Sequence, residues 1–173
     1  MHSLLTSEHK KFIKKFTAHI KKHKYPYGQS AEQLAKQLFT HMTMDEVTSH
    51  DVDYWVEVIT QMISLMSESS LKKPVIEVTH LTADQSVSHI FLVNDNIPFL
   101  VDSATMACAE FGLEVKLISH PIIQIQGQDK NRVLIDKPQK NDIQLKSLIY
   151  IEVSRIDNDQ ERQQLQAYLE KVC

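Results

Sequence analysis

The sequence predicts an α+β protein in which a layer of helices precedes an antiparallel sheet. Apolar residues recur at helical spacing before residue 74, and after it they alternate with polar residues as strands require. The expected order of elements after residue 74 is ββαββα, which describes an antiparallel sheet with two helices on one face. We therefore expect a helical leader over residues 1–73 and an α+β domain over residues 74–173.

Three helices are expected in the leader. The first is capped by Ser7 and ends before Tyr25-Pro26, because a residue preceding proline avoids the helical region. Ser30 and Gln33 fit a capping box that opens the second helix. The third runs from Asp51 to Met66. The apolar stripes that predict these helices are Phe12, Phe16 and Ile20, then Ala31, Leu34, Ala35, Leu38 and Met42, then Val52, Trp55, Val56, Ile59, Ile63 and Met66.

Two strands and a helix are expected next. The strands are Val75–Thr79 and Val87–Val93, and the second is apolar enough at its centre to be covered on both faces. The segment Asn94-Asp95-Asn96 ends it. A helix follows with Pro98 in its first turn, where the missing N–H costs nothing, and it stops at Gly112. Its expected buried face comprises Leu100, Ala104, Ala107, Cys108 and Phe111.

The remaining chain predicts a long hairpin and a last helix. Residues 113–126 read as one strand, in which Pro121 requires an edge position or a bulge. The polar segment 127–141 reads as a hairpin loop with a short extension at 132–135, and Ser147–Val153 is the returning strand. Asp157 or Asn158 caps the last helix. One face of the first strand is expected to carry Leu113, Val115, Leu117, Ile123 and Ile125, and the inward face of the helix Leu165, Tyr168, Leu169 and Val172.

Composition is typical of a globular protein: of 173 residues, 42% are hydrophobic and 24% charged. No apolar run approaches the roughly 20 residues of a membrane span, and the amino terminus lacks the apolar centre of a signal peptide. The two cysteines, Cys108 and Cys173, have no metal-binding spacing around them. They indicate free thiols and a reducing, cytoplasmic location.

Charge is unevenly distributed along the chain. Residues 1–24 contain seven lysines and Glu8, a balance of +6, so the remainder carries −9 to reach the net charge of −3. A basic first helix is compatible with nucleic acid or a protein partner, and the simplest interpretation is a solvated face. Phe12 and Phe16 have core spacing and are not interleaved with the lysines as base-stacking residues. Nucleic acid is therefore not the expected partner.

Few residues point to chemistry. The three glycines (28, 112 and 127) are isolated, which excludes the usual dinucleotide and phosphate-loop fingerprints in this segment. His19 and His23 have the spacing of a helical metal pair but no supporting carboxylate pattern. His120 and Cys108 are interpreted as structural, and helix polarity suffices to explain Asp102. We expect no catalytic residue, no metal and no cofactor in this chain.

One constellation stands out. It consists of Val93–Ser103, then Gly112-Leu113, Ile118–Pro121 and Ser147–Val153. It resembles the amino-terminal region of the large NAD-specific glutamate dehydrogenases of bacteria. In that family a strand leads into a D-M-P-F-L-V-D-S helix, followed by an I-H-P strand and an E-S-h-h-x-h-E strand. The present chain departs from this pattern at Ile97 (usually methionine), at Ser119 before the histidine, and at Lys146 (usually glutamate).

The resemblance implies an ACT-like regulatory domain. The chain would be a non-catalytic regulatory or assembly segment of an enzyme that converts L-glutamate and NAD to 2-oxoglutarate, ammonia and NADH. NAD would bind elsewhere in the parent enzyme, a cytoplasmic homo-oligomer of amino-acid catabolism. The partners implied are the downstream domains and an amino-acid effector, with no membrane. The residues implicated are Asn94, Asp95, Asn96 and Phe99 for the effector, and Asp102 and Ser103 for interdomain contact.

Two other classes remain open. One is a free-standing ACT-type sensor that binds an amino acid, although Phe99 stands where ligand-binding ACT domains often carry glycine. The other is a nucleic-acid-binding helper that uses the lysine-rich first helix, for which binding would depend steeply on salt. A self-contained enzyme is the weakest interpretation, since no nucleophile–base pair is visible.

Overall fold

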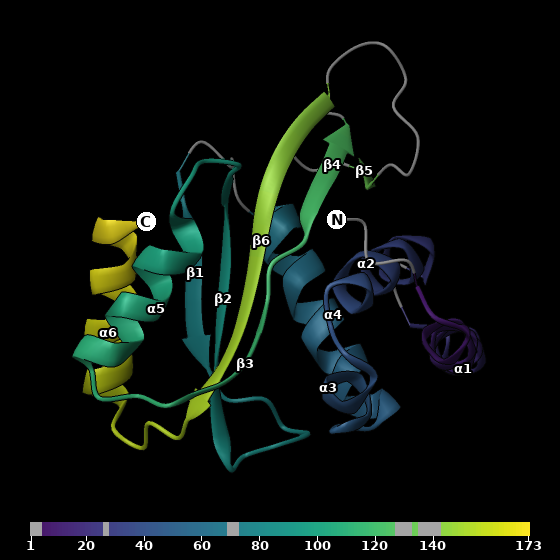
Figure 1. Cartoon of the computed structure of the whole chain (residues 1–173), viewed down its shortest axis with the longest axis horizontal. Helices are drawn as coiled ribbons and strands as arrows, with labels where there is room; N and C mark the ends of the chain where they lie inside the picture. The colour runs from purple at the N-terminus through teal and green to yellow at the C-terminus, as the bar shows by residue number, and fades with distance from the viewer. Residues whose placement is uncertain (1–4, 26–27, 69–72, 127–132, 135–142) are drawn as a thin grey trace.

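A computed structural model describes residues 5–25, 28–68, 73–126, 133–134 and 143–173. It has three layers: helices α1–α4 on one face of an antiparallel sheet, the sheet itself, and helices α5 and α6 on the opposite face (Figure 1). The α+β class and the placement of the last two helices on one face are confirmed. None of the helices in the described ranges is long and apolar enough to span a bilayer.

The first layer contains α1 (Ser7–His23), α2 (Gly28–Thr40), α3 (Met44–Thr48) and α4 (Val52–Glu68). The cap of α1 is Thr6 and not Ser7, because the Thr6 hydroxyl accepts the His9 N–H while the His9 ring bonds back. The predicted cap at Ser30 is also wrong, since α2 already begins at Gly28.

The short helix α3 was not predicted. Its capping box is formed by Thr43 and Glu46, whose side chains satisfy each other's backbone N–H groups. The Asp51 carboxylate accepts the Tyr54 N–H at 2.9 Å and thereby opens α4. The turn between α3 and α4 brings His50 over the sheet, where its ring lies beside Glu152 of β6.

Within the described residues six strands form one sheet, and every pairing is antiparallel. The order is β1-β2-β6-β4-β5, and β3 also pairs with β6. Their bounds are β1 Val75–Thr79, β2 Val87–Asp95, β3 Val115–Ser119, β4 Ile122–Gln126, β5 Val133–Leu134 and β6 Ile143–Ser154. The expected four strands become six because the run at 113–126 divides at Pro121 and because β5 is added. The other residues of the predicted loop at 127–141 lie outside the described part of the chain.

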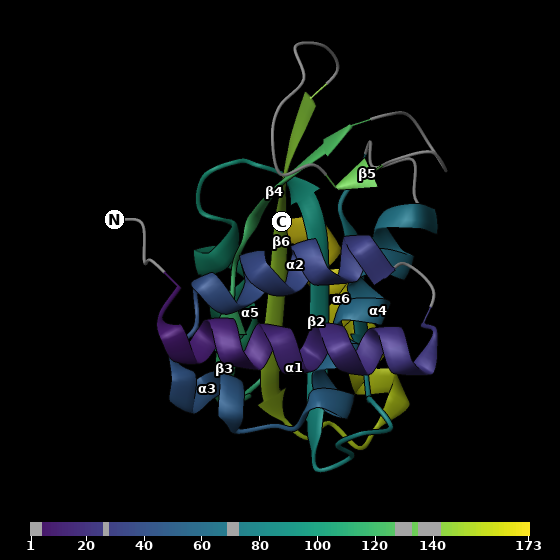
Figure 2. The ribbon, with the colours of Figure 1, turned by 90° about the vertical axis from the view of Figure 1, so that its right-hand side faces the viewer.

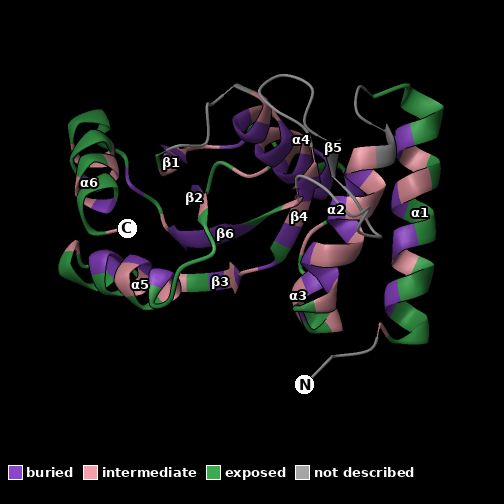
Figure 3. Ribbon diagram, turned by 90° about the horizontal axis from the view of Figure 1, so that it is seen from above, coloured by how far each residue is buried: buried purple, intermediate pink, exposed green. Residues whose placement is uncertain are grey.

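Strand β2 is buried from Val87 to Val93, as its continuous apolar centre predicted. The strand extends further than expected, however, and Asn94 and Asp95 belong to it. Side chains of β2 and β6 alternate between two hydrophobic clusters, one beneath the first layer and one beneath α5 and α6. The centre of the sheet, formed by β2 and by β6 from Lys146 to Val153, is therefore buried on both faces (Figure 3).

The β3–β4 segment corrects one expectation. The pairing of β3 with β6 shifts register between Val115 and Leu117, a β-bulge. Consequently Val115 contacts the α5–α6 cluster, whereas Leu117 lies in the cluster beneath the first layer with Ile123 and Ile125. The predicted common face is thus wrong at Leu113 and Val115, which both pack on the α5–α6 cluster, because an extra residue reverses the alternation.

Helix α5 (Leu100–Glu110) begins later than predicted, so Pro98 precedes the helix and Phe99 is its cap. Its buried face includes the predicted Leu100, Ala104, Ala107 and Cys108. Phe111 is only partly buried, because it lies at the end of the helix beside Tyr168, with ring centroids 5.8 Å apart. Gly112 has φ +66°, as the predicted left-handed cap requires.

Helix α6 (Asp159–Val172) is capped by Asn158, one of the two predicted residues. It buries Leu165 and Leu169, but Val172 is exposed near the end of the chain, contrary to expectation. The helix lies along the outer edge of β1, where the Gln166 side chain accepts the Val78 N–H at 3.2 Å.

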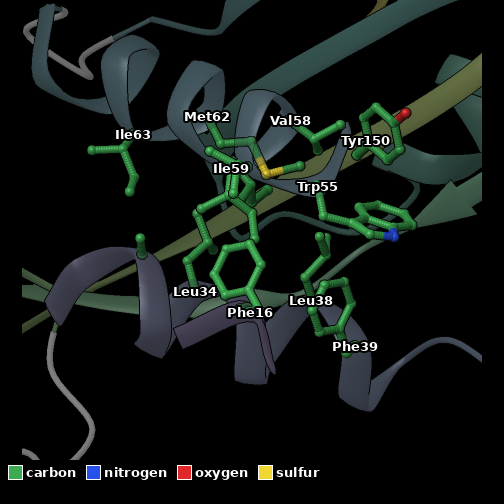
Figure 4. Packing of buried hydrophobic residues seen from close by; sticks show 14 of the residues in the cluster. Phe16, Leu34, Leu38, Phe39, Trp55, Val58, Ile59, Met62, Ile63 and Tyr150 are labelled. Carbon is green, nitrogen blue, oxygen red and sulfur yellow. The ribbon is translucent and has the colours of Figure 1, made fainter. Parts of the chain in front are cut away.

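The first layer shares a core with the sheet. Trp55 and Phe39 pack edge to face in this core, and Trp55 lies near Tyr150 of β6 (Figure 4). The Trp55 indole donates to the Val47 carbonyl at 2.8 Å, which ties α3 to α4. Helix α1 lies outermost, across α2 and α4 (Figure 2). The division at residue 73 stays a prediction.

Candidate functional site

The predicted site residues run from the end of β2, through the turn that follows it, to the first turn of α5. Consecutive strand residues point to opposite faces, so Asn94 and Asp95 diverge. The Asn94 amide donates to the Cys173 carbonyl at 2.9 Å, on the α6 side of the sheet. On the opposite side of the sheet, the Asp95 carboxylate accepts a hydrogen bond from Lys146 Nζ at 2.5 Å. Both side chains therefore have structural partners.

Phe99 has an unusual environment. Its φ is +66°, a left-handed conformation that L-residues with bulky side chains rarely adopt, and its side chain is 74% exposed. Its carbonyl accepts the Ser103 N–H at 2.9 Å in the first turn of α5. Ile97, two residues earlier, is 45% exposed. Two large apolar side chains thus project from the turn that starts the helix.

A shallow hollow of ≈ 490 Å³ lies at this turn. It brings together Asn96, Phe99 and Asp102 from the loop and helix, and His120 from the end of β3. Asn96 also accepts the Ser147 hydroxyl at 3.1 Å. The hollow faces the start of α5, where backbone N–H groups favour a negative charge.

His120 was interpreted as structural, yet the structure places it on the wall of this hollow. Its Nε2 atom is buried and has no hydrogen-bond partner among the described residues. Burial, reinforced by the nearby charge of His41, holds the pKa of His120 below its usual range. Because this nitrogen is shielded, His120 contributes other atoms to the wall of the hollow.

Asp102 and Ser103 differ in exposure. Asp102 is exposed in the first turn of α5, as expected for a residue that contacts another domain. Ser103 is half-buried, and its backbone N–H donates to the Phe99 carbonyl in the first turn of α5. We refer to Ile97, Phe99 and Asp102 together as the α5 entry surface.

A second polar cluster, which sequence reasoning missed, joins the first layer to the sheet. It is the buried polar network of His50, Tyr54, His89, Tyr150 and Glu152. The Glu152 carboxylate accepts from Tyr54 Oη and pairs with His50 Nε2, each at 2.8 Å. Tyr54 and Tyr150 bond through their hydroxyls, and His89 Nδ1 lies 3.1 Å from the Tyr150 hydroxyl. The His50 ring stacks on Tyr54 with centroids 3.6 Å apart.

Burial and hydrogen bonds together determine the ionisation of this network. Burial alone would raise the pKa of Glu152, but the hydrogen bonds from His50 and Tyr54 outweigh it and hold that pKa below its usual range. Burial also lowers the pKa of His89 and raises the pKa of both tyrosines. At neutral pH the network therefore consists of a carboxylate, two phenols and a neutral His89. Its members bond to one another across the boundary between the first layer and the sheet, so its chemistry is that of a structural link.

The remaining candidates have ordinary surroundings. His19 Nε2 lies 2.8 Å from Asp53 Oδ1, and its ring is 4.4 Å from that of His23. Among the described residues, no three His, Cys, Asp or Glu side chains are grouped so as to hold a metal ion. Cys108 is a free, buried thiol, and burial raises its pKa to about 11. It is therefore a poor nucleophile at neutral pH.

The sequence matches the family described as "Glutamate dehydrogenase, ACT1 domain" over residues 34–169. The matched range begins within α2 and ends within α6, so it includes the whole sheet, the hollow and the buried polar network. Neither the curated proteins nor the solved structures contain a significant match.

Proposed function

The chain belongs to the glutamate dehydrogenase ACT1 domain family, and from this we propose that it is the non-catalytic regulatory and assembly segment of a large NAD-specific glutamate dehydrogenase. The oxidation of L-glutamate by NAD takes place in other domains of that enzyme. The parent enzyme is a cytoplasmic homo-oligomer, and this segment contacts its downstream domains through the α5 entry surface.

The observation that carries the assembly role is the conformation of Phe99. A left-handed backbone at a bulky residue costs about 1–2 kcal/mol. The isolated chain gains little in return, because the Phe99 ring is 74% exposed. Covering the ring with a neighbouring domain would bury apolar area and offset that cost. The adjacent Ile97 and the carboxylate of Asp102 would supply further apolar and charged contact.

The test compares Phe99→Asn with Met106→Ala in the full-length enzyme. Asparagine tolerates the left-handed conformation and removes the ring, whereas Met106 is exposed on the same helix outside the α5 entry surface. We expect Phe99→Asn to leave the stability of the isolated chain unchanged or raised, and to reduce dehydrogenase activity or oligomer content several-fold. Met106→Ala should alter neither. Normal activity and assembly in the full-length Phe99→Asn enzyme would refute the assembly role.

A second experiment tests the absence of catalysis. The purified chain is incubated with glutamate and NAD, and NADH is followed by absorbance. We expect no turnover, because the chain has no glycine-rich dinucleotide loop. Activity that copurifies with the folded chain through successive columns would contradict the proposal.

Binding of an amino-acid effector is a second candidate function, favoured by the hollow at the start of α5 that Asn96, Phe99 and His120 line. An effector carboxylate would face the helix N–H groups, and the rest of the ligand would lie against Phe99 and His120. Titration with glutamate and other amino acids, followed by NMR, should shift the signals of Asn96, Phe99 and His120. Unchanged signals at millimolar concentrations would exclude this function.

A further inference from the structure

A groove of ≈ 640 Å³ lies between α1 and α2, at the opposite end of the molecule from α5 and α6 (Figure 1). Lys10, Lys14 and Lys21 of α1 line it, together with Lys36 of α2. Ile13 supplies an apolar side chain to its floor. We call this feature the lysine groove. It lies far from the α5 entry surface and has no part in the function proposed above.

The groove is strongly cationic. Its four lysines face one acid, Glu32, which already pairs with Lys36 at 3.3 Å. Lys10, Lys14 and Lys21 are exposed and form no ion pair within the described residues. The first 24 residues as a whole carry +6, while the rest of the chain carries −9. The structure thus concentrates unpaired positive charge beside an apolar floor.

The lysines have a helical geometry. Lys10, Lys14 and Lys21 are separated by four and seven residues, so their side chains stand on one side of α1, over a length of about 16 Å. A third helix lying in the groove would present residues at i, i+4 and i+11 with the same rise. We propose that the lysine groove docks an acidic amphipathic helix, which places carboxylates along the lysines and apolar side chains on the floor.

Nucleic acid fits this surface less well. Among the described residues, no aromatic side chain lines the groove. Phe12 and Phe16 of α1 pack instead against Phe39, with ring centroids 5.5 Å and 6.2 Å away. Single-strand binders use exposed aromatic rings for base stacking, and the acidic remainder of this chain repels a long polyanion. A helix with a short row of carboxylates satisfies the groove without approaching that acidic surface.

The chain provides a matched control. Lys11, Lys15 and Lys22 have the same spacing on the same helix but do not line the groove. Replacing either set by glutamine removes the same charge and retains good helix propensity. The K10Q/K14Q/K21Q and K11Q/K15Q/K22Q variants therefore differ only in which side of α1 loses its lysines. Circular dichroism verifies that both variants fold.

The probe is a synthetic amphipathic helix with glutamates at i, i+4 and i+11 and a leucine stripe, and its binding is followed by fluorescence anisotropy. We expect saturable binding that K10Q/K14Q/K21Q weakens about tenfold, with K11Q/K15Q/K22Q remaining within about twofold. If the groove variant does not fold, NMR of the unaltered chain replaces it, and the peptide should shift the signals of Ile13 and Ala18. Equal weakening by both variants, unshifted groove signals, no peptide binding, or binding of duplex DNA in its place would each overturn the proposal.

Discussion

Replacing Glu152 by glutamine removes the charge at the centre of the buried polar network and keeps the size of the side chain. The carboxylate, with a side chain 8% exposed, accepts from Tyr54 and pairs with His50, each at 2.8 Å. A hydrogen bond to a buried charge contributes about 1.5–3 kcal/mol. Glutamine retains one carbonyl acceptor, so we expect Glu152→Gln to lower the free energy of unfolding by about 2–3 kcal/mol at neutral pH.

The pH dependence follows from the lowered pKa of Glu152. Its stabilising contribution is present above the unfolded-state pKa of about 4.5 and is lost as pH falls through the lower folded-state value. The difference between the original chain and Glu152→Gln should therefore be constant near neutral pH and shrink in stronger acid. Burial of neutral His89, whose pKa is also lowered, should reduce the stability of the original chain as pH falls below about 6.5.

Urea unfolding monitored by tryptophan fluorescence measures this effect. Trp55 is the single tryptophan of the chain and is fully buried. Its ring centroid lies 6.2 Å from that of Tyr150, so its fluorescence reports on contact between α4 and the sheet. The control is Glu114→Gln, which alters an exposed glutamate and should change stability by less than about 0.5 kcal/mol. A Glu152→Gln loss no greater than the control, or a difference that persists unchanged in acid, would refute the role assigned to the network.

Three further predictions concern α5 and its surroundings. Leu165→Ala should lower the free energy of unfolding in urea by about 3 kcal/mol, because Leu165 is fully buried. Phe111→Ala should lower it by less, because Phe111 is partly exposed. The reverse order would mean that the core is misassigned. Gly112→Val should lower the thermal midpoint although nothing lies within 4 Å of an added Cβ, because φ is +66°, and an unchanged midpoint would contradict this. Asp102→Asn should leave the isolated chain within about 0.5 kcal/mol while reducing full-length dehydrogenase activity; equal melting shifts in both contexts would argue against interdomain contact.

Periodicity predicted most elements because their side chains face one layer or alternate between two. It failed where geometry departs from the ideal. The bulge between Val115 and Leu117 reverses the alternation, and no proline or glycine in this segment indicates it in the sequence. The helix α3 was missed because five residues are too few for a stripe, although Thr43 and Glu46 carry a visible capping signature.

The two functional regions differed in how far they were predictable. The α5 entry surface lies within one continuous segment, so its residues could be identified from the sequence, and only the conformation of Phe99 required a structure. The buried polar network joins residues about a hundred positions apart, such as Tyr54 and Glu152. In the sequence Glu152 resembles any polar residue on the solvent side of an alternating strand. Nothing short of the folded contacts reveals that α3 and α4 cover it.

The hydrogen bond from Val78 to Gln166 also affects how the protein behaves at high concentration. An edge strand with free N–H groups is a template on which a foreign strand can pair, and such pairing starts many aggregates. Here α6 lies along β1, and its Gln166 side chain occupies a donor that an incoming strand would use. The helix thereby hinders the pairing of a foreign strand with this edge of the sheet. Chains shortened before Gln166 would lose this protection and become prone to precipitation.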